Sequence, residues 1–181
     1  LVLKMILKMV NTAMLILMAG HGSTIDVLGS GMHALLRFPD QHQKLRADPA
    51  LVGTAVQEMF RYEAPLPYFH RFATKDCEIG GRSFKAGTRF GLLYGAANRD
   101  PARFELPDMF DITRSPNRHI AFGKGAHLCL GNHLAALDMD VIFSTLNQRF
   151  AKIELAGGPP EYKRGLSVRG PKSLRIAVTP V

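Results

Sequence analysis

The sequence predicts a mainly α-helical α+β fold in a single domain, and three features support this prediction. The chain opens with a long apolar segment, continues through a middle part rich in Gly and Pro with short strand-like runs, and returns to a helical pattern after residue 131. Its 181 residues are 46% hydrophobic and 21% charged, which is typical of globular rather than disordered proteins. This length suffices for one domain with a buried core.

The first third of the chain is expected to form helices. Residues 1–36 should form one long helix, loosened at Gly20–Gly22. Asp40 is expected to cap a short helix over residues 41–46, and another helix should cover residues 49–62. The proline that opens this last helix is favourable there, because the first turn leaves its N–H groups without intrahelical partners.

The remainder of the chain should combine short strands, turns and one further helix. We expect a strand over 71–74, a hairpin over 77–90, a short helix over 92–98, an irregular segment over 100–118, a helix over 132–149, and strands over 152–155 and 174–178.

The apolar N-terminal segment is interpreted as a core helix and not as a membrane span. Lys4 and Lys8 lie one helical turn apart within it, and a membrane span tolerates internal lysines badly. A signal peptide would carry its positive charge ahead of the apolar run. Cys77 and Cys129 are too few for a disulfide framework, so we expect a cytoplasmic protein with no membrane partner.

The net charge of +8 leaves several classes of partner to consider. Nucleic acid is not expected, because the chain has no Lys/Arg tract and no alternation of basic and aromatic residues. An acidic protein partner and a merely solvated basic surface both remain open.

One segment carries the strongest functional signal, the run Phe122-Gly-Lys-Gly-Ala-His-Leu-Cys-Leu-Gly131. A lone cysteine among glycines suits a thiolate that holds one face of a flat metal cofactor, because glycine lets the backbone approach closely. The free N–H groups of the following helix can stabilise the charge on sulfur, and a cysteine thiolate is one of the axial ligands of haem iron. The alternative is a buried cysteine in an ordinary Gly-rich turn.

This run resembles the haem-binding signature F-G-x-G-x-H/R-x-C-x-G of the cytochromes P450 at every fixed position. The resemblance implies that the chain binds haem b (iron protoporphyrin IX). It implies that Cys129 is the metal ligand and that Phe122, Gly123 and Gly131 belong to the cofactor-binding loop.

A second motif is the pair Glu58 and Arg61, three residues apart on one helix face. Taken alone it would be an ordinary surface ion pair. Its position about 70 residues before the cysteine resembles the structural E-x-x-R pair of the same family. The family's third partner is usually a cation, but Met109 stands at that position here. Arg103 is the candidate replacement, and without one the pair would be uncompensated.

Other cationic residues match positions that bind the haem propionates in this family. Arg71, His119 and His127 are therefore expected to bind the cofactor, although a lone Arg or His is more often a surface residue. The other histidines show no metal-ligand pattern. Arg114, Arg118 and Lys124 cluster near the cysteine and could form a basic docking surface or only a solvated rim.

The segment Ala19-Gly-His-Gly-Ser-Thr24 resembles the family's oxygen-site motif A-G-x-E/D-T-T. Ser23 and Thr24 are thereby implied as catalytic hydroxyls, whereas Gly22 stands where the family has an acid. Proton delivery is therefore expected to be impaired. The alternative is a loosened Gly-Ser turn without a catalytic role.

The resemblance covers nearly the whole chain and is to the soluble bacterial type. Family members are about twice as long, so residues 1–181 are expected to be a single truncated haem-binding domain, the C-terminal half of the fold. The implied function is a monooxygenase that oxidises a small organic substrate with O2 and electrons from a ferredoxin or another acidic donor. The rivals are a non-catalytic haem-binding remnant and a haem-free module, and an uncovered apolar helix would make the chain a homo-oligomer.

Overall fold

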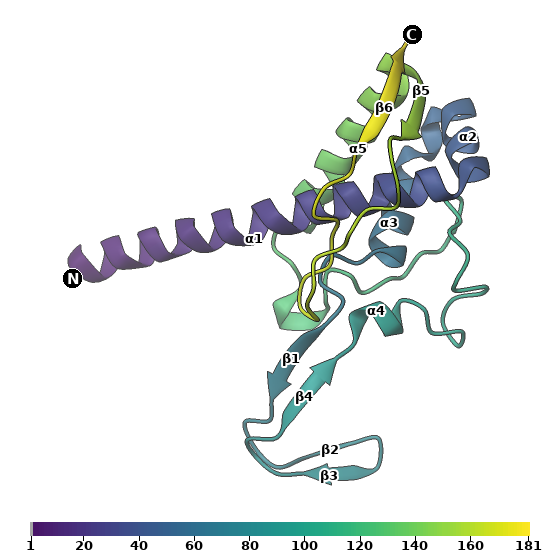
Figure 1. Cartoon of the computed structure of the whole chain (residues 1–181). Helices are drawn as coiled ribbons and strands as arrows, with labels where there is room; N and C mark the ends of the chain where they lie inside the picture. The colour runs from purple at the N-terminus through teal and green to yellow at the C-terminus, as the bar shows by residue number, and fades with distance from the viewer. Residues whose placement is uncertain (1) are drawn as a thin grey trace.

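The helical core is built on one long helix, and the computed structural model describes residues 2–181. Figure 1 shows α1 as a straight rod whose C-terminal half crosses the other helices. The helices are α1 (Val2–Arg37), α2 (Pro39–Ala47), η1 (Pro49–Leu51), α3 (Val52–Tyr62), α4 (Tyr94–Ala97), η2 (Gly125–His127) and α5 (Asn132–Arg149).

The core lies where the second half of α1 packs on α3 and α5. Val27 and Leu35 of α1, Phe60 of α3 and Phe143 of α5 are all buried there. α1 and α3 approach so closely that a Cβ at Gly31 would lie 2.8 Å from the sulfur of Met59. A larger residue at this crossing would push the two helices apart.

Three separate two-stranded antiparallel ribbons complete the described structure. The strands are β1 (Phe69–Phe72) with β4 (Arg89–Leu92), β2 (Cys77–Ile79) with β3 (Arg82–Phe84), and β5 (Phe150–Leu155) with β6 (Ile176–Pro180). Gly80 and Gly81 join β2 to β3 with φ of 58° and 73°, a backbone conformation that a two-residue hairpin turn requires and glycine adopts freely. The first two ribbons project away from the helices (Figure 1).

The predicted fold class and the main helices are confirmed, with three corrections. α1 is unbroken and shows no loosening at Gly20–Gly22. Asp40 does not cap α2, because the helix begins at Pro39 and the side chain of Asp40 accepts a hydrogen bond from Gln41 instead. The predicted hairpin over residues 77–90 is shorter than expected, since β4 turns away to pair with β1.

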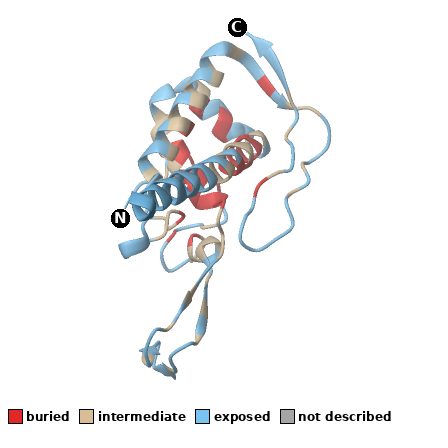
Figure 2. Ribbon diagram, turned by 90° about the vertical axis from the view of Figure 1, so that its left-hand side faces the viewer, coloured by how far each residue is buried: buried red, intermediate tan, exposed pale blue. Residues whose placement is uncertain are grey.

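The first half of α1 extends beyond the core (Figure 1), and Figure 2 colours this part of the helix as exposed. It includes the one helix segment, among the described residues, that is long and apolar enough to span a membrane by length and composition alone. None of that segment is buried, although it carries many exposed Leu, Ile, Val and Met side chains. An apolar surface of this extent indicates a face that contacts another apolar surface.

We predict that the isolated chain self-associates through this exposed half of α1. Covering half of such a helix removes several hundred Å² of apolar surface, on the order of 10 kcal/mol at about 25 cal/mol per Å² before association costs. Light scattering across a dilution series should show species larger than a monomer. Ile6→Lys together with Leu17→Lys should shift the population to monomer, whereas Lys4→Gln should not. A compact monomer of the unaltered chain at micromolar concentration would contradict this prediction.

Candidate functional site

The loop that precedes α5 holds Cys129 on a tightly constrained backbone. The N–H of Cys129 donates to the carbonyl oxygen of Phe122 at 2.9 Å, and the N–H of Leu128 donates to that of Gly125 at 3.0 Å. Gly123 and Gly125 have φ of 72° and 73°, which side chains other than glycine rarely adopt. These contacts close the loop locally, so its shape is built from residues 122–129 themselves.

The side chain of Cys129 is an exposed, free thiol just ahead of the N-terminus of α5. Gly131 is the N-cap residue of this helix, and the positive end of the helix dipole favours a negatively charged sulfur nearby. Leu128 and Leu130 on either side are also exposed, so the thiol lies within apolar surface.

This donor set fits a cofactor that takes one protein ligand. Among residues 2–181 no three His, Cys, Asp or Glu side chains gather as a metal-binding group. A single accessible thiolate within apolar surface would suit a haem, because the porphyrin itself would supply four nitrogen ligands to the iron and the protein would need to add only one.

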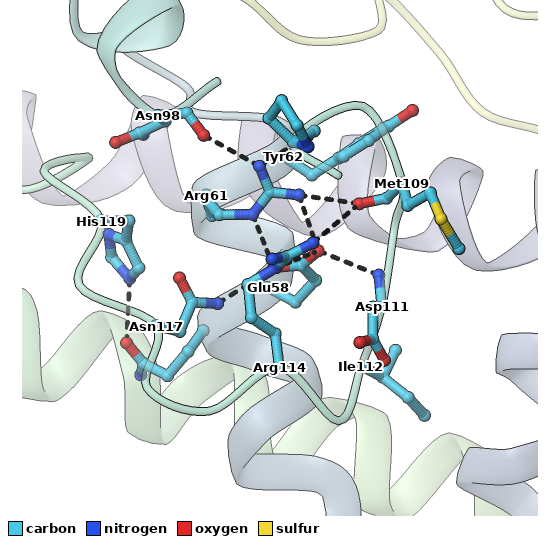
Figure 3. Close-up of polar contacts among 12 residues, drawn as sticks. Glu58, Arg61, Tyr62, Asn98, Met109, Asp111, Ile112, Arg114, Asn117 and His119 are labelled. Carbon is cyan, nitrogen blue, oxygen red and sulfur yellow. Dashed lines mark hydrogen bonds and ion pairs between the residues drawn. The ribbon is translucent and has the colours of Figure 1, made fainter. Parts of the chain in front are cut away.

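A buried ion pair ties α3 to the irregular segment that leads to the cysteine loop. The Glu58 and Arg61 side chains have no exposed surface, and two N–H groups of Arg61 donate to the two carboxylate oxygens of Glu58 at 2.7 and 2.8 Å. The remaining N–H groups of Arg61 donate to the carbonyl oxygens of Asn98, Pro107 and Met109, each at 2.8 Å. Figure 3 shows the guanidinium of Arg61 between Glu58, Asn98 and Met109.

The third charged partner of the pair is Arg114. Its Nε lies 3.3 Å from Oε2 of Glu58, and its side chain is only 11% exposed. Glu58 also accepts hydrogen bonds from the backbone N–H of Asp111 at 2.9 Å and from the amide of Asn117 at 3.0 Å. The predicted substitute, Arg103, is wrong: it is exposed, and Met109 contributes its carbonyl oxygen rather than a charge. The pair is therefore compensated.

Comparison with known proteins agrees with this geometry. The Cytochrome P450 family model matches residues 6–178. This chain belongs to the cytochrome P450 family. Members of the family are haem-containing monooxygenases.

Individual relatives show how much of a P450 the chain represents. The "Biotin biosynthesis cytochrome P450" of Bacillus subtilis (strain 168) is 42% identical over 166 residues, which cover 92% of this chain and 42% of that protein. "Cytochrome P450-terp" of a Pseudomonas species is 44% identical over 161 residues, covering 89% of this chain and 37% of that protein. The chain thus spans about two fifths of the length of these relatives.

Solved P450 structures share the same fold. The crystal structure of P450BioI with a hexadec-9Z-enoic acid-ligated acyl carrier protein superposes with a TM-score of 0.86 at 42% identity, covering 88% of this chain and 42% of that one. CYP109E1 from Bacillus megaterium in complex with corticosterone superposes with a TM-score of 0.89 at 30% identity, covering 93% of this chain and 46% of that one. The predicted C-terminal part of the P450 fold is confirmed.

Two of the three predicted propionate ligands have donors to spare. Arg71 lies in β1, where one N–H donates to the carbonyl oxygen of His70 at 2.8 Å and the guanidinium lies 5.2 Å from the ring centre of Phe69. A guanidinium has five N–H donors, so most of them are left for a carboxylate. His127 is exposed in η2 of the cysteine loop.

The third, His119, is bound within the chain. Its Nδ1 accepts from the N–H of Ala121 at 3.3 Å, and its Nε2 lies 3.0 Å from the side-chain oxygen of Gln57 (Figure 3). Together these contacts define a neutral ring protonated on Nε2. Burial lowers the pKa of His119 to about 4, despite the opposing charge of Glu58. A hydrogen bond to a propionate would have to displace one of these partners.

The two hydroxyls predicted to be catalytic are bound to their own helix. Ser23 donates to the carbonyl oxygen of Ala19 and Thr24 to that of Gly20, each at 2.8 Å. Such bonds satisfy the hydroxyl protons but leave the oxygen lone pairs available to accept. A Cβ at Gly22 would meet nothing within 4 Å, so the position has room for the acid that the family motif carries there.

Arg114 and Asn117 are the residues around the pair that sequence reasoning missed. Arg114 was assigned to a basic surface, but its side chain points inward to Glu58. Both residues lie in the irregular segment, where no periodicity indicates which side chains are buried. The available signal was their closeness in sequence to a hydrophobic residue, Ile112, which is buried in the structure.

We predict that breaking the pair destabilises the fold. Glu58→Ala or Arg61→Ala should each cost about 3–5 kcal/mol of unfolding free energy, because one charge is left buried without its partner. Urea unfolding followed by circular dichroism measures the loss. Lys85→Ala removes an ion pair with Asp76 that is exposed to solvent, and this change should leave the stability nearly unchanged. Equal, small effects for all three variants would contradict the prediction.

The same measurement tests the corrected third partner. Arg114→Ala should cost about 1–3 kcal/mol, because it removes a hydrogen bond to a buried carboxylate. Arg103→Ala is the matched control and should leave stability unchanged within about 0.5 kcal/mol. A larger loss from Arg103→Ala than from Arg114→Ala would restore the original assignment.

His119 should make stability depend on pH. Because the pKa of His119 is about 4 in the folded chain and 6.5 for an unperturbed histidine, the unfolded state binds the extra proton at a higher pH than the folded state does. The contribution of the neutral His119 ring to the unfolding free energy is fully present above about pH 6.5. It is lost as the pH falls toward 4, by up to about 3 kcal/mol. The unfolding free energy, measured between pH 7.5 and 4.5, should therefore depend less steeply on pH for His119→Gln than for the unaltered chain. His21→Gln, at an exposed position, should keep the parent slope.

Proposed function

We propose that this chain is the haem-binding part of a haem-thiolate monooxygenase that oxidises a small organic substrate. The observation that carries the proposal is the exposed thiol of Cys129, presented by a glycine-shaped loop ahead of α5 in a chain of the P450 family. When bound, haem b supplies the activation of O2 and the oxidation of the substrate.

Each residue of the proposed site has a role that its surroundings support. Cys129 holds the iron as a thiolate. Phe122 packs against Phe60 with ring centres 4.5 Å apart, which fixes the start of the loop on α3. Arg71 and His127 bind the propionates and offset the cost of burying them.

The polypeptide shape of the loop is part of the same proposal. Gly123 has a positive φ, and Gly131 is the N-cap residue of α5, two residues after Cys129. Ser23 and Thr24 of α1 hold protons on the oxygen side. His119 contacts Gln57 of α3 within the chain, and as a third propionate ligand it would exchange one of its present hydrogen-bond partners for the carboxylate.

The partners are proposed from charge and surface. The chain carries a net charge of +8, and the exposed residues Arg118 and Lys124 precede Cys129 in the sequence. This supports docking of a ferredoxin or another acidic electron donor, for which complementary charge mainly accelerates association. Both described cysteines are free, which supports a cytoplasmic location.

The second candidate is a non-catalytic haem-binding or self-associating protein of the same family. Gly22 at the acid position of α1 and the exposed apolar side chains of residues 2–18 favour it. In that case residues 1–181 would act as one haem-binding domain that forms homo-oligomers through α1. Both candidates bind haem, but only the first converts a substrate into product.

We predict that Cys129 ligates the haem iron as a thiolate. The chain reconstituted with haem and reduced under carbon monoxide should show the strongly red-shifted Soret band of thiolate ligation. Cys129→Ser should abolish that band, and Cys77→Ser in β2 should preserve it. An unchanged band in Cys129→Ser would exclude the assignment, and no haem uptake by the unaltered chain would favour a haem-free module. Haem binding without product formation, when donor and substrate are supplied, would favour the second candidate.

A further inference from the structure

The helix that lacks an acid at Gly22 carries a buried acid one turn later. Asp26 lies four residues after Gly22 and three after Ser23, so the three positions share one face of α1. The side chain of Asp26 is only 1% exposed. A carboxylate so deeply buried on a helix needs either full pairing or a function that uses its free oxygen.

The two oxygens of this carboxylate have different surroundings. Oδ1 accepts a hydrogen bond from Nζ of Lys163 at 2.5 Å. Oδ2 is buried and has no hydrogen-bond partner among the described residues. A buried polar atom of this kind typically binds an ordered water, which in turn contacts a second polar group.

The partner of Asp26 connects it to solvent. The side chain of Lys163 is 43% exposed, and its backbone N–H donates to the carbonyl oxygen of Gly170 at 2.9 Å. Gly170 lies directly against the acid, so that a Cβ there would fall within 2.5 Å of the Asp26 side chain. The segment holding both residues therefore closes over the carboxylate while its lysine reaches the surface.

We propose that Asp26 relays protons from solvent to the hydroxyl of Ser23, the role that Gly22 cannot fill. The inference rests on the proposed monooxygenase function, in which reduction of O2 consumes protons. Asp26 touches neither cofactor nor substrate in this scheme, so it acts through the Ser23 hydroxyl.

The proton balance of the relay is simple. A proton from bulk water enters beside Lys163 and binds to Oδ2 of Asp26. It passes through an ordered water to Oγ of Ser23, whose lone pairs are free because its own proton is donated to Ala19. The Ser23 hydroxyl then breaks its hydrogen bond to Ala19 and would donate that proton to the reduced oxygen, while the arriving proton replaces it on Oγ. The carboxylate returns to its starting state, and no electron moves through these residues.

The first test does not involve activity. A high-resolution crystal structure of the haem-free chain should show an ordered water within hydrogen-bond distance of both Oδ2 of Asp26 and Oγ of Ser23. An Oδ2 without a bound water, or a water that contacts Asp26 but not Ser23, would overturn the relay.

The second test measures proton transfer in the haem-loaded chain. Dithionite-reduced chain is mixed with O2 in H2O and in D2O, and the return of the oxidised haem spectrum is followed. The bound haem would supply the electron for O2 in this reaction, and the residues of the relay would supply the protons that the reduced oxygen consumes. Asp26→Asn, which keeps the size of the side chain, should slow the reaction about 100-fold. Ser23→Ala should slow it similarly, and combining the two changes should add little.

Two further variants separate a relay from a structural ion pair. Glu161→Gln removes an exposed pair with Lys172 on the same segment and should leave the rate unchanged. Gly22→Glu in the Asp26→Asn background returns a carboxylate to the same helix face and should restore most of the rate. If Asp26 only fastens the segment to α1, that double variant stays as slow as Asp26→Asn.

The outcomes also distinguish this inference from the function on which it rests. Absence of the thiolate Soret band in the unaltered chain would contradict the proposed function. A normal band with parent rates in Asp26→Asn would contradict the relay alone. If Asp26→Asn does not fold, Ser23→Ala decides, because it leaves the Asp26–Lys163 pair intact, and parent rates in that variant would overturn the relay.

Discussion

Two opposite charges with no exposed side-chain surface, Glu58 and Arg61, hold the irregular part of this chain against its helical core. Burying one of them alone would cost several kcal/mol, so the pair is tolerable only because each remaining donor and acceptor finds a partner. Arg61 satisfies three backbone carbonyls, and Glu58 accepts from Asp111, Arg114 and Asn117. A segment without regular secondary structure thereby receives hydrogen bonds that a helix or sheet would otherwise supply.

The cysteine loop follows directly from that anchored segment. The anchor determines where the loop starts, since His119 binds Gln57 and Phe122 packs on Phe60 of the same helix. Within the loop, glycine backbone geometry decides how the thiol is presented. The proposed chemistry of the chain therefore depends on a sulfur that carries out no structural role and on a charge network that carries out no chemistry.

Buried polar contacts also fasten α1 and the end of α3 to the segment over residues 162–169. Asp26 pairs with Lys163, Glu63 with Arg169 at 3.2 Å, and the ring of His33 with the hydroxyl of Tyr162 at 3.0 Å. In the two ion pairs the acid is buried and the cation reaches solvent. This arrangement lowers the cost of burial because the long basic side chains keep their heads hydrated.

Features that act over a few residues could be predicted from the sequence. Apolar periodicity, prolines and glycines predicted the main helices, and the spacings of Glu58 to Arg61 and of Phe122 to Cys129 predicted the pair and the loop. Contacts between distant groups depend on the three-dimensional packing: β4 pairs with β1 rather than β3, Arg114 rather than Arg103 contacts Glu58, and Lys163 contacts Asp26. These contacts join irregular segments to helices far away in the chain. Periodicity carries no information there, because which side chain turns inward depends on how the backbone is anchored at both ends.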